Sequence, residues 1–203
     1  MAKTNYSLAL FGSGGFGRDV ASQYKKDTGD DILFIVDDLY YSNQKNTIPF
    51  SQFVPEETKV IVAVADPIAR KGIVQKFPKN TVWGSYISKD ALIYSNCVSV
   101  GEGSIICPGA ILTQNIELGK HTHLNIHTSV GHDSIVGDYF TCSPGAKVSG
   151  NCRIGDNVFI GTNAVIREKL QVVSNTSIGL LAGVVSDITT SGTYVGTPAK
   201  KIQ

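Results

Sequence analysis

This sequence of 203 residues has little charge and almost no net charge. Only 17% of its residues are charged, and 18 basic against 17 acidic side chains leave a formal net charge of +1. A strongly basic face attracts nucleic acids or anionic membranes, so this balance gives no electrostatic reason to expect either partner. No apolar run is long enough to cross a bilayer, and residues 1–6 lack the apolar core of a signal peptide. We therefore expect a cytoplasmic protein without a membrane span.

Cysteine is also scarce, and its spacing is irregular. The four cysteines form no C-x-x-C pair and none lies 18 residues from another; they are Cys97, Cys107, Cys142 and Cys152. Zinc sites and redox motifs use closely paired cysteines, and disulfides are rare in reducing compartments. We therefore expect buried free thiols and no bound metal.

What the sequence does contain is a six-residue repeat that runs from Val100 to Val184. Every sixth residue of this stretch is aliphatic, apart from the small hydrophobe Cys142, and glycine often follows it. A period of six fits neither an amphipathic helix nor an alternating strand. It is typical of hexapeptide solenoids, which are parallel β-helices with three hexapeptides in each triangular coil. Residues 18 apart should therefore stack on one face of a β-helix.

The N-terminal part has the pattern of a nucleotide-binding half-domain. Strands are expected at 7–11, 32–36 and 60–64, and a helix at 19–26. Glycines after the first strand let the backbone approach phosphate, and acidic side chains after the second strand can accept from ribose or base donors. This part is too short for a full dinucleotide domain, which favours a single nucleotide or nucleotide sugar. The expected nucleotide-sugar-binding residues are Gly12, Ser13, Gly14, Gly15, Phe16, Gly17, Arg18, Asp37 and Asp38.

An irregular stretch separates the two parts. Ile87 and Ile93 are six residues apart, but Val100 follows only after seven, so the regular register begins after an insertion. We therefore place the boundary near Trp83 and predict a Rossmann-like α/β domain at 1–83 and a β-helix at 84–203. Pro198 removes a backbone donor and is expected to lie in a cap at the open end.

All four histidines fall within twelve residues, at His121, His123, His127 and His132. Stacking at 18 residues places Gln114 and Gly150 on either side of His132, and Asn115 and Asn151 on either side of Asp133. A histidine beside a bare glycine N–H is the arrangement that a general base and an oxyanion donor need. For His121 and His123 we favour a plain solvated position on an edge of the β-helix.

These features together resemble one known family. The sequence is similar to the sialic-acid O-acetyltransferase and nucleotide-aminosugar N-acetyltransferase family, and the resemblance covers nearly the whole chain. It is carried by the glycine turn, Asp37-Asp38, the hexapeptide repeats, Gly131-His132-Asp133-x-x-Val136-Gly137 and Gly196-x-Pro198-Ala199-Lys200.

The resemblance implies a left-handed β-helix and a homotrimer that binds acetyl-CoA between subunits, with no metal. It implies that His132 is the general base, Asp133 its orienting partner, Gly150 the oxyanion donor and Asn125 a further catalytic residue. The implied acetyl-CoA-binding residues are Thr141, Gly145, Ala146, Gly161 and Thr162. Two positions differ from relatives: Phe16 and Thr141 each stand where many or some relatives have a histidine.

The function that we predict is acetyl-CoA-dependent N-acetylation of the C4 amine of a nucleotide-linked 4-amino-4,6-dideoxysugar, in surface polysaccharide biosynthesis such as that of an O-antigen. O-acetylation of a sugar such as sialic acid is the alternative within enzymes. A γ-type carbonic anhydrase is a remote alternative, because His127 and His132 have a suggestive spacing but Ala91 stands where a third zinc ligand would be needed. A non-catalytic nucleotide-sugar-binding scaffold is the last alternative.

Overall fold

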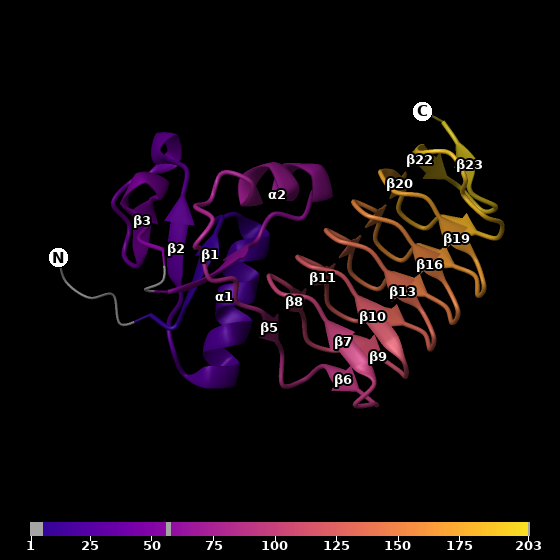
Figure 1. The fold of residues 1–203 in the computed structure, drawn as a ribbon, viewed down its shortest axis with the longest axis horizontal. Helices are drawn as coiled ribbons and strands as arrows, with labels where there is room; N and C mark the ends of the chain where they lie inside the picture. The colour runs from indigo at the N-terminus through magenta and orange to yellow at the C-terminus, as the bar shows by residue number, and fades with distance from the viewer. Residues whose placement is uncertain (1–5, 56–57, 203) are drawn as a thin grey trace.

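The computed structural model describes residues 6–55 and 58–202 and has two parts, an N-terminal α/β part and a β-helix (Figure 1). Residues 1–5, at the start of the first predicted domain, lie outside the described residues. The elements of the N-terminal part are β1 (Leu8–Phe11), α1 (Gly15–Thr28), β2 (Leu33–Val36), η1 (Asp38–Tyr40), β3 (Thr47–Pro49), η2 (Phe50–Gln52), β4 (Lys59–Val62) and α2 (Pro67–Val74).

The N-terminal sheet is parallel, with the strand order β3-β2-β1-β4. Its central strands are apolar and buried on both faces, as strands of parallel sheets are; Leu10 and Ile61 are fully buried. The chain leaves β1 toward β2 on one side and later returns to β4 on the other. Ligands of open α/β sheets bind at such a reversal, beyond the carboxyl ends of the strands. The glycine turn and Asp37 lie at that edge.

Three parallel sheets form the faces of the β-helix, whose strands are two or three residues long in each regular coil. The eight-stranded face contains β5 (Tyr86–Ile87), β8 (Ile105–Ile106), β11 (His123–Leu124), β14 (Thr141–Cys142), β17 (Phe159–Ile160), β20 (Thr176–Ile178), β22 (Gly192–Val195) and the antiparallel β23 (Lys200–Lys201). The six-stranded face contains β6 (Leu92–Ile93), β9 (Ile111–Leu112), β12 (Ser129–Val130), β15 (Lys147–Val148), β18 (Val165–Ile166) and β21 (Gly183–Val184). The five-stranded face contains β7 (Val98–Val100), β10 (Ile116–Leu118), β13 (Ile135–Val136), β16 (Arg153–Ile154) and β19 (Gln171–Val172).

The six-residue repeat explains this geometry residue by residue. The aliphatic positions point inward and are almost fully buried, from Ile106 to Val184. Three residues after each of them the backbone turns a corner with a positive φ, at every sixth residue from 103 to 181. Glycine or asparagine fills many of these turn positions, because these residues adopt the left-handed conformation at least cost. The predicted left-handed β-helix and its stacking rule are confirmed.

The two parts share a hydrophobic contact. Leu8, Leu10 and Val20 pack in one buried cluster with Tyr86 and Ile105 of the first coils. Three cysteines are buried as expected, but Cys97 is exposed, and all four are free. At the far end, the Ala199 N–H donates to the Gly183 carbonyl (2.8 Å), so the segment that includes Pro198 folds over the last coil.

Arg70 of α2 is fully buried where the two parts meet. Its guanidinium donates to the carbonyls of Val64 and Ala65 on one side (2.6 and 3.0 Å). On the other side it donates to carbonyls of the β-helix, those of His121 (3.0 Å), Tyr139 (2.8 Å) and Phe140 (3.1 Å). One side chain therefore fixes the carboxyl end of β4 against two successive coils of the solenoid.

The expected solvated positions of His121 and His123 are wrong. His121 is 3% exposed, stacked on Tyr139 and edge-on to Trp83, and the Nδ1 atom of His123 lies 3.2 Å from an Arg70 nitrogen. Burial, with the Arg70 charge, lowers the pKa of His121 to about 4 and that of His123 well below its ordinary value. Both imidazoles are neutral packing groups of the domain contact. The sequence could not show this burial, because the surface that covers both histidines belongs to the N-terminal part.

Candidate active site

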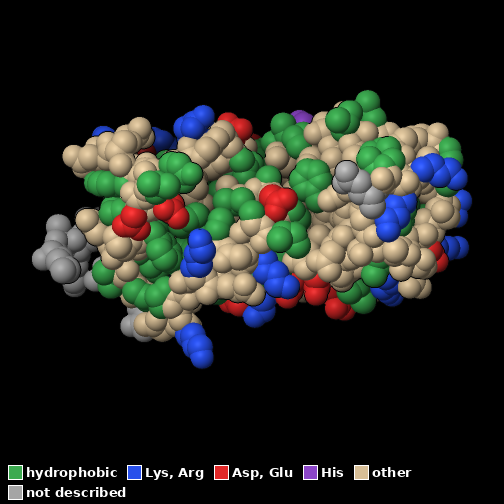
Figure 2. Space-filling view, turned by 90° about the horizontal axis from the view of Figure 1, so that it is seen from above, with side chains coloured by type: hydrophobic (Ala, Val, Ile, Leu, Met, Phe, Trp, Pro, Cys, Tyr) green, Lys and Arg blue, Asp and Glu red, His purple; other side chains and the backbone are tan. Residues whose placement is uncertain are grey.

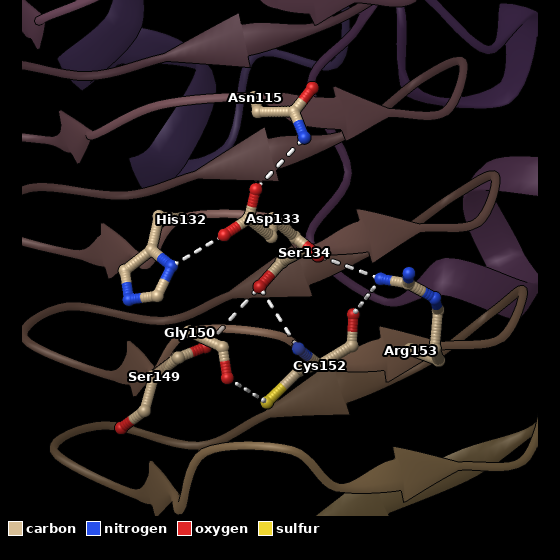
Figure 3. A network of polar contacts seen from close by, with 8 residues as sticks. All are labelled: Asn115, His132, Asp133, Ser134, Ser149, Gly150, Cys152 and Arg153. Atoms are coloured by element: carbon tan, nitrogen blue, oxygen red, sulfur yellow. Dashed lines mark hydrogen bonds and ion pairs between the residues drawn. The ribbon is translucent and has the colours of Figure 1, made fainter.

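His132 and Asp133 lie at the corner between the six-stranded and five-stranded faces, which we call the His132 corner. His132 Nδ1 and Asp133 Oδ2 are 2.7 Å apart, and both side chains are about half exposed or more (60% and 45%) (Figure 3). Hydrogen bonds from Asn115 and then His132 lower the pKa of Asp133. An ionised Asp133 accepts from Nδ1–H, and this contact favours the tautomer whose lone pair lies on Nε2.

Gly150 lies directly beneath that nitrogen, one coil further on. A Cβ atom at this position would come within 2.6 Å of His132 Nε2, so only glycine leaves the ring its place. The Gly150 N–H donates to no acceptor among the described residues. The stacking of His132, Asp133, Asn115 and Gly150 predicted from the repeat is therefore found, and it brings an imidazole and this backbone N–H together.

The other residues predicted for acetyl-CoA and catalysis lie at a different corner of the same chain. Asn125, Gly145, Ala146, Gly161 and Thr162 all fall between the eight-stranded and six-stranded faces, and we call this the Asn125 corner. A triangular prism keeps its corners apart, so one protomer does not unite the two groups.

Several of these residues already use their backbone donors within the solenoid. The N–H groups of Gly145, Ala146 and Gly161 donate to Ile126, Ser143 and Ile178 carbonyls at 3.0, 3.0 and 2.7 Å. Thr162 is exposed, and its hydroxyl has no hydrogen-bond partner in the part of the chain that the structure describes. Thr141 has another neighbour: it is 3% exposed, and its hydroxyl donates to the Ala65 carbonyl of the N-terminal part (2.7 Å).

The glycine turn has the geometry of a phosphate-binding loop. Gly12 has φ +108°, and a Cβ at Gly17 would overlap the Gly12 carbonyl oxygen at 2.0 Å, so α1 can begin this close to β1 only with glycine. Gly14 caps α1 without a side-chain bond, which leaves the first N–H groups of the helix available to an anion. Arg18 folds back onto the Ser13 carbonyl (2.8 Å), and the Phe16 ring packs against His123.

The acidic pair divides into two roles. Asp38 uses both carboxylate oxygens on Ser51, accepting from its N–H (3.1 Å) and from its hydroxyl. Asp37 accepts from the Leu39 N–H through Oδ1 (3.1 Å), and its Oδ2 has no hydrogen-bond partner among the described residues. Both residues were predicted ligands, and within the described part of the chain Asp37 is the one that presents an uncommitted oxygen at the sheet edge. The reason is a turn contact with Ser51, which the sequence pattern does not reveal.

Charged side chains of both signs are scattered over the face shown in Figure 2 rather than gathered in one field. Within residues 6–55 and 58–202, no helix is long and apolar enough to span a bilayer. The same residues contain no group of three or more His, Cys, Asp or Glu side chains that could hold a metal ion.

Comparison with known proteins gives consistent relatives. A family model described as the PglD N-terminal domain matches residues 7–77. A GDP-perosamine N-acetyltransferase of Escherichia coli O157:H7 is 31% identical over 170 residues, 78% of this chain and 77% of the relative. The acetyltransferase domain of PglB from Neisseria gonorrhoeae FA1090, solved in complex with acetyl coenzyme A, is 30% identical with a TM-score of 0.86, over 98% of this chain and 100% of that chain.

A more distant relative matches only part of the chain. A probable carbonic anhydrase of Methanocaldococcus jannaschii is 33% identical over 87 residues, which is 39% of this chain and 54% of the relative. Hexapeptide solenoids host several chemistries, so a partial match of this kind identifies the scaffold and not the reaction.

Proposed function

The chain belongs to the family of hexapeptide-repeat nucleotide-sugar N-acetyltransferases, and from that premise we propose that it acetylates the C4 amine of a nucleotide-linked 4-amino-4,6-dideoxysugar. Acetyl-CoA is the acyl donor. The observation that supports the assignment is the pairing of His132 with Asp133 above Gly150, because an imidazole then lies next to a backbone N–H that has no acceptor among the described residues. The product would enter surface polysaccharide biosynthesis in the cytoplasm.

In the proposed mechanism the amine nitrogen attacks the thioester carbonyl carbon while His132 Nε2 accepts one of its protons. The tetrahedral oxyanion accepts a hydrogen bond from the Gly150 N–H, and one oxyanion donor contributes about 3 kcal/mol in well-studied acyl-transfer enzymes. The C–S bond then breaks, and the proton passes from His132 to the sulfur of the departing CoA. Asp133 holds the imidazole in the tautomer that makes Nε2 the acceptor.

We propose that the active enzyme is a homotrimer with its sites between subunits. The predicted residues divide between the His132 corner and the Asn125 corner of one chain, so a site that uses both needs a second copy. The Asn125 corner also exposes Ile126, Leu180 and Leu181, with exposed fractions of 38, 69 and 64%. Apolar side chains that gather in this way mark surfaces that are covered in an assembly.

The nucleotide part is proposed to bind at the carboxyl edge of the N-terminal sheet. The diphosphate would lie against the first N–H groups of α1, where the helix dipole favours negative charge. The free oxygen of Asp37 would accept from a ribose hydroxyl or a base N–H. Phe16 adds no polar contact there, because its ring packs against His123.

The test combines a substrate panel with one variant. UDP-, dTDP- and GDP-linked 4-amino sugars would be incubated with acetyl-CoA, and the released thiol would be measured with a thiol reagent. At least one donor–acceptor pair should turn over, and His132→Ala should lose at least about 100-fold in kcat while keeping its oligomeric state and its thermal shift with the nucleotide. A His132→Ala enzyme that works at the wild-type rate would remove this residue from the mechanism.

A further inference from the structure

Asp133 is held by the coil on each side of its own (Figure 3). From one side the Asn115 amide nitrogen donates to Oδ1 (2.9 Å), and from the other an Arg153 guanidinium nitrogen donates to the Asp133 carbonyl (2.7 Å). The Asp133 N–H also donates to the Gln114 carbonyl (3.0 Å). Both the carboxylate and the backbone of this residue are therefore fixed from outside its own coil.

The Asn115 contact decides which oxygen faces the imidazole. A carboxylate can rotate and exchange its two oxygens, and an exposed one does so against competing water. With Oδ1 taken by Asn115, Oδ2 is the oxygen that meets His132 Nδ1 at 2.7 Å. The ring is then oriented with Nε2 over Gly150, which is the side where the proposed chemistry occurs.

The Arg153 contact acts on the backbone. Asp133 has φ +59°, a conformation that an aspartate adopts at some cost. One Arg153 nitrogen bridges the Asp133 and Cys152 carbonyls (2.7 and 3.3 Å), which ties the corner of one coil to the next strand. Its positive charge also lowers the pKa of the Asp133 carboxyl, by less than the hydrogen bonds from Asn115 and His132 do.

We infer that Asn115 and Arg153 are positioning residues that aim the His132–Asp133 pair at the reacting amine. The inference rests on the proposed function, in which His132 is the base. Neither residue needs to touch substrate: Asn115 acts through the carboxylate and Arg153 through the backbone carbonyl of the same residue.

The chain supplies a matched control for Asn115. Asn151 occupies the same corner one coil beyond Asp133 and has the same left-handed backbone (φ +58°), but its side chain makes no hydrogen bond to any described residue. Glycine tolerates this conformation without strain, so Asn115→Gly and Asn151→Gly remove the two side chains at equal backbone cost.

Steady-state kinetics would test Asn115. We expect Asn115→Gly to lower kcat about tenfold, as loss of an orienting partner does. The KM for acetyl-CoA and the KM for the nucleotide-linked amino sugar should both stay within about twofold of wild type. Asn151→Gly should match wild type. In a cycle with Asp133→Asn, the double variant should be no slower than Asp133→Asn alone, because Asn115 acts only through that carboxylate. Equal rates for the two glycine variants, or losses that multiply in the cycle, would overturn the inference.

Arg153→Gln would test the positioning role inferred for Arg153. We expect kcat to fall several-fold while the KM for acetyl-CoA stays the same; a raised KM with an unchanged kcat would show instead that Arg153 binds the cofactor. The His132→Ala result distinguishes a failure of the positioning inference from a failure of the proposed mechanism. If that variant is inactive while Asn115→Gly equals wild type, only the positioning inference fails; if His132→Ala is fully active, the proposed mechanism fails first.

Discussion

His121 and His132 lie only eleven residues apart in sequence, yet the structure surrounds the two side chains in opposite ways. His121 is 3% exposed, stacked between aromatic rings and held neutral by burial. The His132 side chain is 60% exposed and paired with a carboxylate. One region joins the two parts of the chain, and the other presents an imidazole to solvent.

The six-residue repeat determines where a residue lies on the β-helix, but it does not determine what covers that residue. Both residues lie at corners of the same β-helix, and their neighbours 18 residues away are equally predictable. What distinguishes them is the surface outside the solenoid: α2 covers one corner with Arg70, and nothing in the described chain covers the other. Each prediction below changes one side of this contrast.

The largest effect is expected from removing the Arg70 clamp. Arg70→Met would remove the guanidinium donor from the buried His121 carbonyl and from the part-buried carbonyls of Val64 and Tyr139, and each such loss costs roughly 1–3 kcal/mol. We expect the free energy of unfolding to fall by about 3–5 kcal/mol, measured by denaturant titration. Arg167→Met, at an exposed arginine, should change it by no more than about 0.5 kcal/mol. A stable Arg70→Met protein would show that the domains are held by the apolar cluster alone.

The next effect is a loss of stability in acid. The folded pKa of His121, about 4, lies below the ordinary 6.5, so the unfolded chain takes up a proton first as the pH falls. Stability should therefore be lost between pH 6.5 and 4, by about 3 kcal/mol from this residue. His121→Asn, which suits the positive φ of that position, should flatten the curve of unfolding free energy against pH in this window. A curve parallel to that of wild type would mean that His121 is charged or exposed.

The β-helix and the stacked neighbours of His132 could be predicted from the sequence, because a six-residue period determines which residues lie next to each other in successive coils. The Asn115–Asp133 contact follows from the same arithmetic. The burial of His121 and His123 and the hydrogen bond from Thr141 to Ala65 could not be predicted, because they depend on how the N-terminal part packs against the β-helix. Nor could the sequence distinguish Asp37 from Asp38, since Ser51 lies thirteen residues beyond Asp38, in the short 3-10 helix η2, and no periodic pattern links the two.

On the other side of the contrast, filling the space beneath His132 should stop the chemistry without unfolding the protein. Gly150→Ala would place a methyl group within 2.6 Å of Nε2, and the exposed ring would swing away. We expect kcat to fall about 100-fold, comparable to the loss of an oxyanion donor, with little change in melting temperature. Gly183→Ala is the matched control, because the atoms nearest to its added Cβ would belong to the side chain of Thr197. An active Gly150→Ala enzyme would argue against a reaction beneath this ring.

The smallest effect concerns Thr141, which the family resemblance assigns to acetyl-CoA and the structure assigns to the domain contact. Thr141→Val keeps the shape of the side chain and removes its hydroxyl, so the Ala65 carbonyl loses a 2.7 Å hydrogen bond. Loss of one such bond should lower the free energy of unfolding by about 1 kcal/mol and leave the KM for acetyl-CoA unchanged. Thr162→Val is its counterpart at the exposed Asn125 corner, where stability should stay constant and the KM for acetyl-CoA should rise. If the two variants exchange these effects, Thr141 belongs to the cofactor site after all, and the domain contact must open when acetyl-CoA binds.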